Sequence, residues 1–154
     1  MTVESEASTV LPIVGWADVQ ASATGALAGF SIFRLRQIGV PDSEGSTVLD
    51  TRAVSSVILS YDNSNGFQTG LAIANQGPAS TVMMTIRDES GAILGSLQIP
   101  VATSGHTAFM LTSQFIQAAN RRGTVEFQNT SGNITGVSIR FSPALSFISL
   151  PIVR

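Results

Sequence analysis

The sequence contains no cysteine and no lysine, and only 12% of its residues carry a charge. The lack of cysteine excludes disulfides, thiolate metal sites and thiol nucleophiles. All eight basic residues are arginines and the net charge is −2, so the basic surface that nucleic-acid binding requires is not expected. No apolar run reaches the ~18 residues of a membrane span. These absences argue against thiol chemistry, nucleic-acid binding and insertion into a bilayer.

The residues that are present favour strands and turns. Serine, threonine, glycine and asparagine supply most of the polarity, and these residues are poor in helix interiors. A chain of 154 residues fits one domain with its own core. Turn signals recur roughly every 8–12 residues, as in sandwiches and barrels. We therefore predict an all-β fold, an antiparallel β-sandwich of about ten strands with one short helix near Ser113–Ala119. A flexible tail over residues 1–10 precedes a single sandwich domain over 11–154.

We expect one stretch, Leu59–Asn75, to form the centre of this fold. Two uncharged runs flank a polar turn that ends in Asn65 and Gly66, and Asn-Gly tolerates the positive φ angles of a tight turn. This pattern predicts a hairpin. Neither face of the outgoing strand carries a charge, which is typical of a central strand covered on both sides.

A second clear strand covers Thr81–Arg87, where apolar residues alternate with others. We expect Val82, Met84 and Ile86 to face the core. The acid and glycine of Asp88–Gly91 predict a hairpin turn, followed by a strand that Pro100 ends.

Two segments of the chain resemble each other, GWADVQASATGALAGFSI at 15–32 and GTVEFQNTSGNITGVSI at 123–139. The similarity predicts related hairpins at both places. In the second segment Val125 and Phe127 alternate with polar residues and should face inward. The same register in the first segment places Ala17 and Val19 inside, and Trp16, Asp18 and Gln20 on an outer face.

Six blocks in combination resemble an uncharacterised β-sandwich module of large secreted or surface bacterial proteins. The blocks are GWADV, GFSIFR, YDNSNGFQTGLAIAN, TIRDESGAILG, GHTAFML and ANRRGTVEFQNTSGNITGVSIRF, and the resemblance extends from Gly15 to Val153. It implies an accessory domain that is extracellular or at the cell surface. The module has no assigned activity, so no functional residues carry over. No signal-peptide pattern is visible, which fits a domain cut from a longer parent.

Little in the sequence indicates catalysis. His106 is the only histidine, and no Gly-x-Ser-x-Gly motif accompanies it, so we expect neither an enzyme nor a cofactor. Asp62, Asn63 and Asn65 carry oxygens of the kind that calcium prefers. Their spacing does not match an EF-hand, and we expect a turn without metal.

Trp16, Asp18 and Gln20 are the candidate contact residues, because exposed aromatic rings stack on sugars or anchor protein contacts. A tryptophan packed under a loop is the competing interpretation. The sequence favours a non-catalytic extracellular module with a structural or adhesive role, which acts through surface contacts with protein partners, neighbouring domains or itself. One alternative is a carbohydrate-binding module that uses the Trp16 face. The other is a self-assembling subunit, joined into oligomers or filaments by strand addition.

Overall fold

The computed structural model describes residues 15–20, 27–36, 38–40, 42–50, 52, 54–150 and 152–153; the predicted tail over residues 1–10 lies outside them. The strands are β1 (Phe30–Leu35), β2 (Ser43–Val48), β3 (Ser56–Asp62), β4 (Gln68–Asn75), β5 (Ser80–Asp88), β6 (Ile93–Val101), β7 (His106–Met110), β8 (Arg122–Asn129), β9 (Ile134–Phe141), β10 (Phe147–Leu150) and β11 (Ile152–Val153). A short helix, α1 (Leu111–Gln114), and a 3₁₀ turn, η1 (Ile116–Ala118), lie between β7 and β8.

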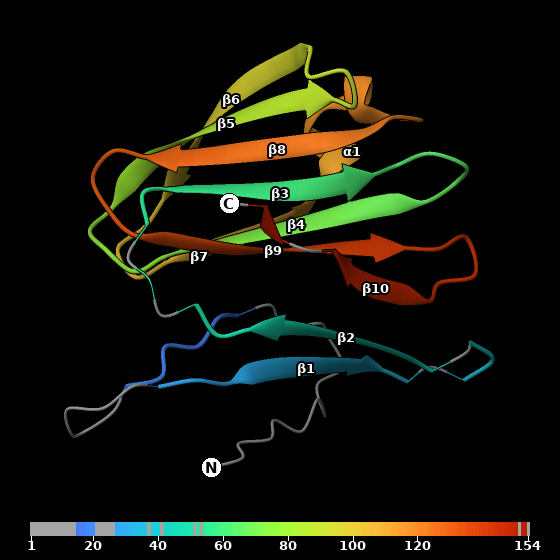
Figure 1. Ribbon diagram of the computed structural model, residues 1–154, viewed down its shortest axis with the longest axis horizontal. Coiled ribbons are helices and arrows are strands. Elements are labelled where there is room, and N and C mark those ends of the chain that lie inside the picture. The colour runs from blue at the N-terminus through green and yellow to red at the C-terminus, as the bar shows by residue number, and fades with distance from the viewer. Residues whose placement is uncertain are drawn as a thin grey trace.

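The strands form an antiparallel β-sandwich, as the sequence predicts. One sheet has five strands in the order β11-β3-β8-β5-β6, and the other has four in the order β10-β9-β4-β7. Strands β1 and β2 form a separate two-stranded ribbon (Figure 1). Within each sheet every pairing of neighbours is antiparallel.

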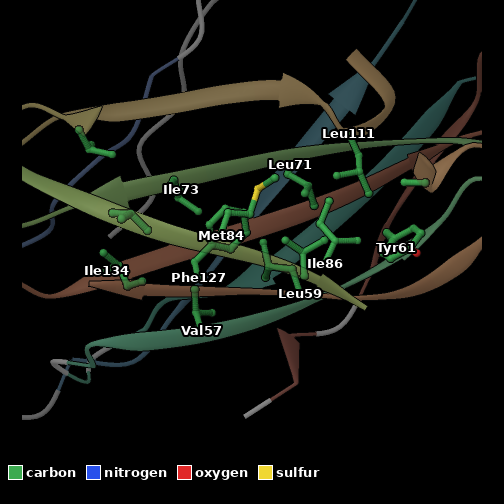
Figure 2. Close-up of a cluster of buried hydrophobic side chains, with 14 residues drawn as sticks. Val57, Leu59, Tyr61, Leu71, Ile73, Met84, Ile86, Leu111, Phe127 and Ile134 are labelled. Atoms are coloured by element: carbon green, nitrogen blue, oxygen red, sulfur yellow. The ribbon is translucent and has the colours of Figure 1, made fainter. Parts of the chain in front are cut away.

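The core lies between the two larger sheets (Figure 2). The predicted inward residues of β5, Val82, Met84 and Ile86, are fully buried, and so are Val125 and Phe127 of β8. Successive side chains of a strand point to opposite faces, so these positions confirm the predicted registers of both strands.

The turn at Asn65-Gly66 is confirmed, but the hairpin is wrong. Both residues have positive φ, 53° and 79°, yet β3 and β4 belong to different sheets. The hydroxyl of Thr69 bonds both the N–H and the carbonyl of Asp62, each at 2.9 Å. A side chain thus replaces the backbone ladder at this turn, and the chain crosses from one sheet to the other. Strand β4 is central, with β9 and β7 on its two sides.

The two predicted related hairpins at 15–32 and 123–139 are also wrong. Residues 15–20 form no strand, and β1 pairs with β2 instead. Strand β8 lies in the five-stranded sheet and β9 in the four-stranded sheet. The backbone N–H groups of Asn129 and Ile134 bond the carbonyls of Ser55 and Val54. These partners lie in the segment before β3, so the loop between β8 and β9 is held by hydrogen bonds to that segment.

The short helix near Ser113–Ala119 is confirmed, but it begins two residues earlier than predicted and is divided into α1 and η1. Helix α1 begins after Met110 without a side-chain cap, and the hydroxyl of Ser113 donates to the Met110 carbonyl at 2.7 Å. Pro100 lies within β6 rather than ending it, which the edge position of β6 permits because an edge strand needs no second ladder. No helix in the described ranges is long and apolar enough to cross a membrane.

The β1–β2 ribbon attaches to the sandwich through β10. Phe33 packs on Phe147 with ring centroids 6.5 Å apart. The Ser149 hydroxyl donates to the Ser46 carbonyl and accepts from the Ser46 N–H, at 2.7 and 3.2 Å. Gly45 permits this approach, because a Cβ there would lie 2.9 Å from the Phe147 ring. One face of the ribbon is therefore fixed against the sandwich.

Candidate functional site

The predicted contact residues Trp16, Asp18 and Gln20 lie in the irregular segment 15–20. Trp16 is half-buried, and its indole N–H donates to the carbonyl of Ser104 at 3.1 Å. Gln20 donates to the Asp18 carboxylate at 2.9 Å. Both predicted inward residues of this segment, Ala17 and Val19, are exposed, so the predicted register is wrong here. The tryptophan ties its own segment to the loop before β7, which agrees with the packed interpretation.

The side-chain oxygens of Asp62 and Asn63, two of the three weak calcium candidates, already have partners within the chain. One oxygen of Asp62 accepts from the N–H and hydroxyl of Ser64, at 3.0 and 2.6 Å, and the other accepts from Arg140 at 2.7 Å. The Asn63 side-chain oxygen accepts from the N–H of Thr69 at 2.7 Å. Within the described ranges no group of three histidines or acids is placed to hold a metal.

The Asp62 carboxyl belongs instead to an ion-pair cluster at the end of β3. Its burial raises the pKa, but hydrogen bonds from Ser64 and Arg140 lower it more, so the pKa of Asp62 lies below its ordinary 3.8. Arg140 also stacks over Phe67, with its guanidinium carbon 4.3 Å from the ring centroid. The Asp62–Arg140 pair thus joins β3 to β9, one strand from each sheet.

A depression of about 520 Å³ lies beside this pair. Tyr61 of β3, Gly123 of β8 and Asp88 of β5 belong to its lining and lie side by side, because Tyr61 pairs with Gly123 and Gly123 with Asp88. These strand ends lie on the right in Figure 1. The remaining lining residues are Ser60, Asp62, Glu89, Gly91, Arg122, Thr124, Arg140 and Leu150.

Tyr61 is the least expected member of this lining. The residue is 2% exposed and stands at one end of the core cluster (Figure 2). Its buried hydroxyl has no hydrogen-bond partner among the described residues. Burial raises the pKa of the phenol, and the Asp88 carboxylate raises it further. The hydroxyl therefore stays protonated and is able to donate.

Arginines and acids surround the depression. Arg121 lies 3.5 Å from the Asp88 carboxylate, and Arg122 lies 4.0 Å from that of Glu89. Hydrogen bonds from the hydroxyl and N–H of Ser90 hold the pKa of Asp88 below its ordinary value. Arginines at the end of a helix often cap its carbonyls, but here both side chains extend to acids of the β5–β6 turn. Each arginine of the lining therefore has a carboxylate neighbour, Glu89 for Arg122 and Asp62 for Arg140.

A second candidate surface is the outer face of the β1–β2 ribbon. The cross-strand pairs Phe30–Val48, Ile32–Ser46 and Arg34–Glu44 share this face. Phe30, Ile32 and Val48 are 68%, 51% and 63% exposed. Arg34 and Glu44 form an ion pair of 2.8 Å at the far end. We call this set the ribbon face; it combines an apolar end with a charged end.

Comparison with protein-family models, with curated proteins and with solved structures gave no match. The two candidate surfaces therefore rest on the chain's own geometry. Sequence reasoning missed both of them. The segment that contains β2 resembles a loop because it is rich in glycine and charge, and the depression joins residues that are up to 90 positions apart, from Ser60 to Leu150.

Proposed function

We propose that this protein is a non-catalytic β-sandwich module with a structural or adhesive role, and that it acts by pairing with a second copy of itself through the ribbon face. The resemblance of the six sequence blocks to secreted modules supports an extracellular or cell-surface setting. The lone histidine and the lack of a hydrolase motif support a non-catalytic role. The observation that carries the proposal is the exposed apolar end of the ribbon face.

The apolar end is unusual because it faces away from the rest of the fold. Single exposed apolar residues are common on protein surfaces, but a contiguous group marks an interaction site. Phe30 and Val48 lie directly opposite each other, and Ile32 follows on the same face two residues later. Because the opposite face of the ribbon packs on β10, these three side chains point away from the core.

The ribbon face is complementary to itself. A two-fold axis that runs along the ribbon places β1 of one copy over β2 of the other. Phe30 then meets the second copy's Val48, and Arg34 meets its Glu44. Both the apolar and the charged contacts are thus satisfied by one symmetric interface, as in an isologous dimer. Two-fold pairing is the arrangement most common among homo-oligomers.

The test is to replace Ile32 by glutamate and to measure mass by sedimentation equilibrium over a range of concentrations. We expect the wild-type chain to form a dimer as its concentration rises. The Ile32→Glu variant should remain monomeric with an unchanged melting temperature, because Ile32 is half exposed and outside the core.

Ile93→Glu is the matched control. Ile93 is 58% exposed and lies on β6, in a different sheet, so its replacement should leave the dimer intact. A wild-type chain that stays monomeric at about 1 mM, where even a Kd of 1 mM would populate a dimer, would contradict the proposal. Equal loss of the dimer in both variants would place the interface elsewhere.

A further inference from the structure

Two residues that line the depression beside Tyr61 have buried polar atoms that other described residues do not satisfy. The Tyr61 hydroxyl and the Nε atom of Arg140 both lack a hydrogen-bond partner among the described residues, and both residues line the depression. A buried polar group without a partner costs stability, and most such groups in proteins are paired. Two such atoms in residues that line one depression point to a place where a ligand supplies missing bonds.

Two residues of the lining form a long and exposed ion pair. Glu89 and Arg122 have 74% and 54% of their side chains exposed, and their 4.0 Å pair is the longest of the chain's described ion pairs. An exposed pair of this kind contributes little to stability. Arg122 also donates to the Ser64 hydroxyl at 3.1 Å, and both exposed side chains are accessible to a ligand in the depression.

The lining offers both hydrogen-bond donors and acceptors. Arg122 and Arg140 only donate, the carboxylates of Asp88 and Glu89 only accept, and the Tyr61 hydroxyl does both. Adjacent hydroxyls of a sugar ring offer the matching arrangement, since one hydroxyl donates to a carboxylate while its neighbour accepts from a guanidinium. Such charge-assisted bonds are stronger than neutral ones.

The charges of the site are balanced. Three acids, Asp62, Asp88 and Glu89, face Arg122 and Arg140 of the lining, and Arg121 pairs with Asp88 from outside it. A site without net charge gives no advantage to an anion or a cation. Its volume of about 520 Å³ falls within the ~300–1,000 Å³ of small-molecule sites.

We infer that the depression formed by Tyr61, Asp88, Glu89, Arg122 and Arg140 binds a neutral saccharide. This site is separate from the ribbon face and from the Trp16 segment. It adds a ligand to a module whose proposed contacts are with protein, and it does not depend on dimer formation.

The test begins with a glycan array that carries neutral and acidic glycans, probed with the full chain. The neutral sugar with the strongest signal is then titrated by calorimetry, with inorganic phosphate and sulfate as anionic probes. We expect binding of a neutral sugar and none of the anions. Tyr61→Phe should weaken the affinity about tenfold, the loss expected for one hydrogen bond, and Glu89→Gln should weaken it as well.

Tyr61→Phe separates binding from folding. Because the hydroxyl has no described partner within the chain, its removal should leave the melting temperature unchanged or slightly higher. Two controls locate the site. Trp16→Phe tests the alternative sugar face and Ile32→Glu the ribbon face, and neither should change sugar affinity.

Three outcomes would overturn the inference. The first is an array without any neutral signal, and the second is binding of acidic glycans or anions alone. The third is neutral binding that Trp16→Phe abolishes while Tyr61→Phe and Glu89→Gln leave it intact. None of these results bears on the ribbon face, which the mass measurements test separately.

Discussion

Asn75 is the polar residue on which the turn after β4 depends, and its replacement by aspartate should destabilise the fold strongly. Asn75 is fully buried. Its side-chain nitrogen donates to the carbonyl of Pro78 at 2.6 Å and lies 3.3 Å from that of Ala102. Its oxygen accepts from the N–H of Gly77 at 3.0 Å and from the Asn129 amide at 3.4 Å. One side chain thus links two loops and β8.

The magnitude follows from the change of a donor into an acceptor. Asn75→Asp keeps the shape of the side chain but leaves two buried carbonyls facing a carboxylate oxygen. Each buried group left without a partner costs about 1–3 kcal/mol, so we expect a loss of about 2–5 kcal/mol. For a chain of this size the melting temperature should fall by roughly 5–15 °C.

The assay is reversible denaturation in urea, with the free energy of unfolding compared between variants. Asn133→Asp is the matched control, because Asn133 is exposed and only its backbone carbonyl bonds to this turn, through the N–H of Gln76. We expect its effect to stay near ±0.5 kcal/mol. If Asn75→Asp costs no more than Asn133→Asp, the account of this network is wrong.

Three further substitutions test the core, the turn and the ion-pair cluster. Phe127→Ala should cost about 3–5 kcal/mol as a core truncation, whereas Glu126→Ala on the opposite face should change stability by at most about 0.5 kcal/mol; equal losses in urea denaturation would refute the register of β8. Gly66→Val should cost roughly 1–3 kcal/mol because the site requires positive φ, and an unchanged melting temperature would remove that requirement. The pKa of Asp62 is lowered in the folded state, so the carboxylate stabilises the fold above its unfolded pKa, and this stability is lost as the pH falls through the folded pKa. Asp62→Asn should therefore reduce the slope of the free energy of unfolding against pH between about pH 5 and pH 2. An identical slope in the variant would contradict the pairing with Arg140.

The fold class could be predicted because it depends on local patterns. Alternation in β5 and β8 identifies the inward residues, and the Asn65-Gly66 pair identifies a turn by its backbone requirement. Neither signal depends on which strands become neighbours. This is why the sandwich and both registers are confirmed.

The pairing of strands could not be predicted in the same way. A turn such as Asn65-Gly66 joins two strands of one sheet or of two sheets with the same local sequence. Here β3 and β4 belong to different sheets, and the Thr69 hydroxyl takes the place of the ladder at Asp62. The similarity between 15–32 and 123–139 is misleading for a related reason, because residues 15–20 are held by the Trp16 contact with Ser104 and not by a strand partner.

The candidate surfaces also depend on non-local contacts. Nothing in the sequence distinguishes Tyr61 from a core tyrosine with a satisfied hydroxyl. Its unpaired state becomes visible only when Gly123 and Asp88 are placed beside it. Likewise, Phe30 and Val48 form a patch only because β2 pairs with β1 and the other face of the ribbon packs on Phe147.

The most direct test of self-pairing is a mixing experiment with two charge reversals on the ribbon face. In a two-fold dimer Arg34→Glu alone brings two glutamates together across the interface, and Glu44→Arg alone brings two arginines together. Each variant should therefore be monomeric in sedimentation, since like charges oppose pairing. An equimolar mixture restores opposite charges at both contacts, and we predict that the dimer returns. Dimers of undiminished stability in each single variant, or a mixture that stays monomeric while the wild-type chain dimerises, would contradict the proposed interface.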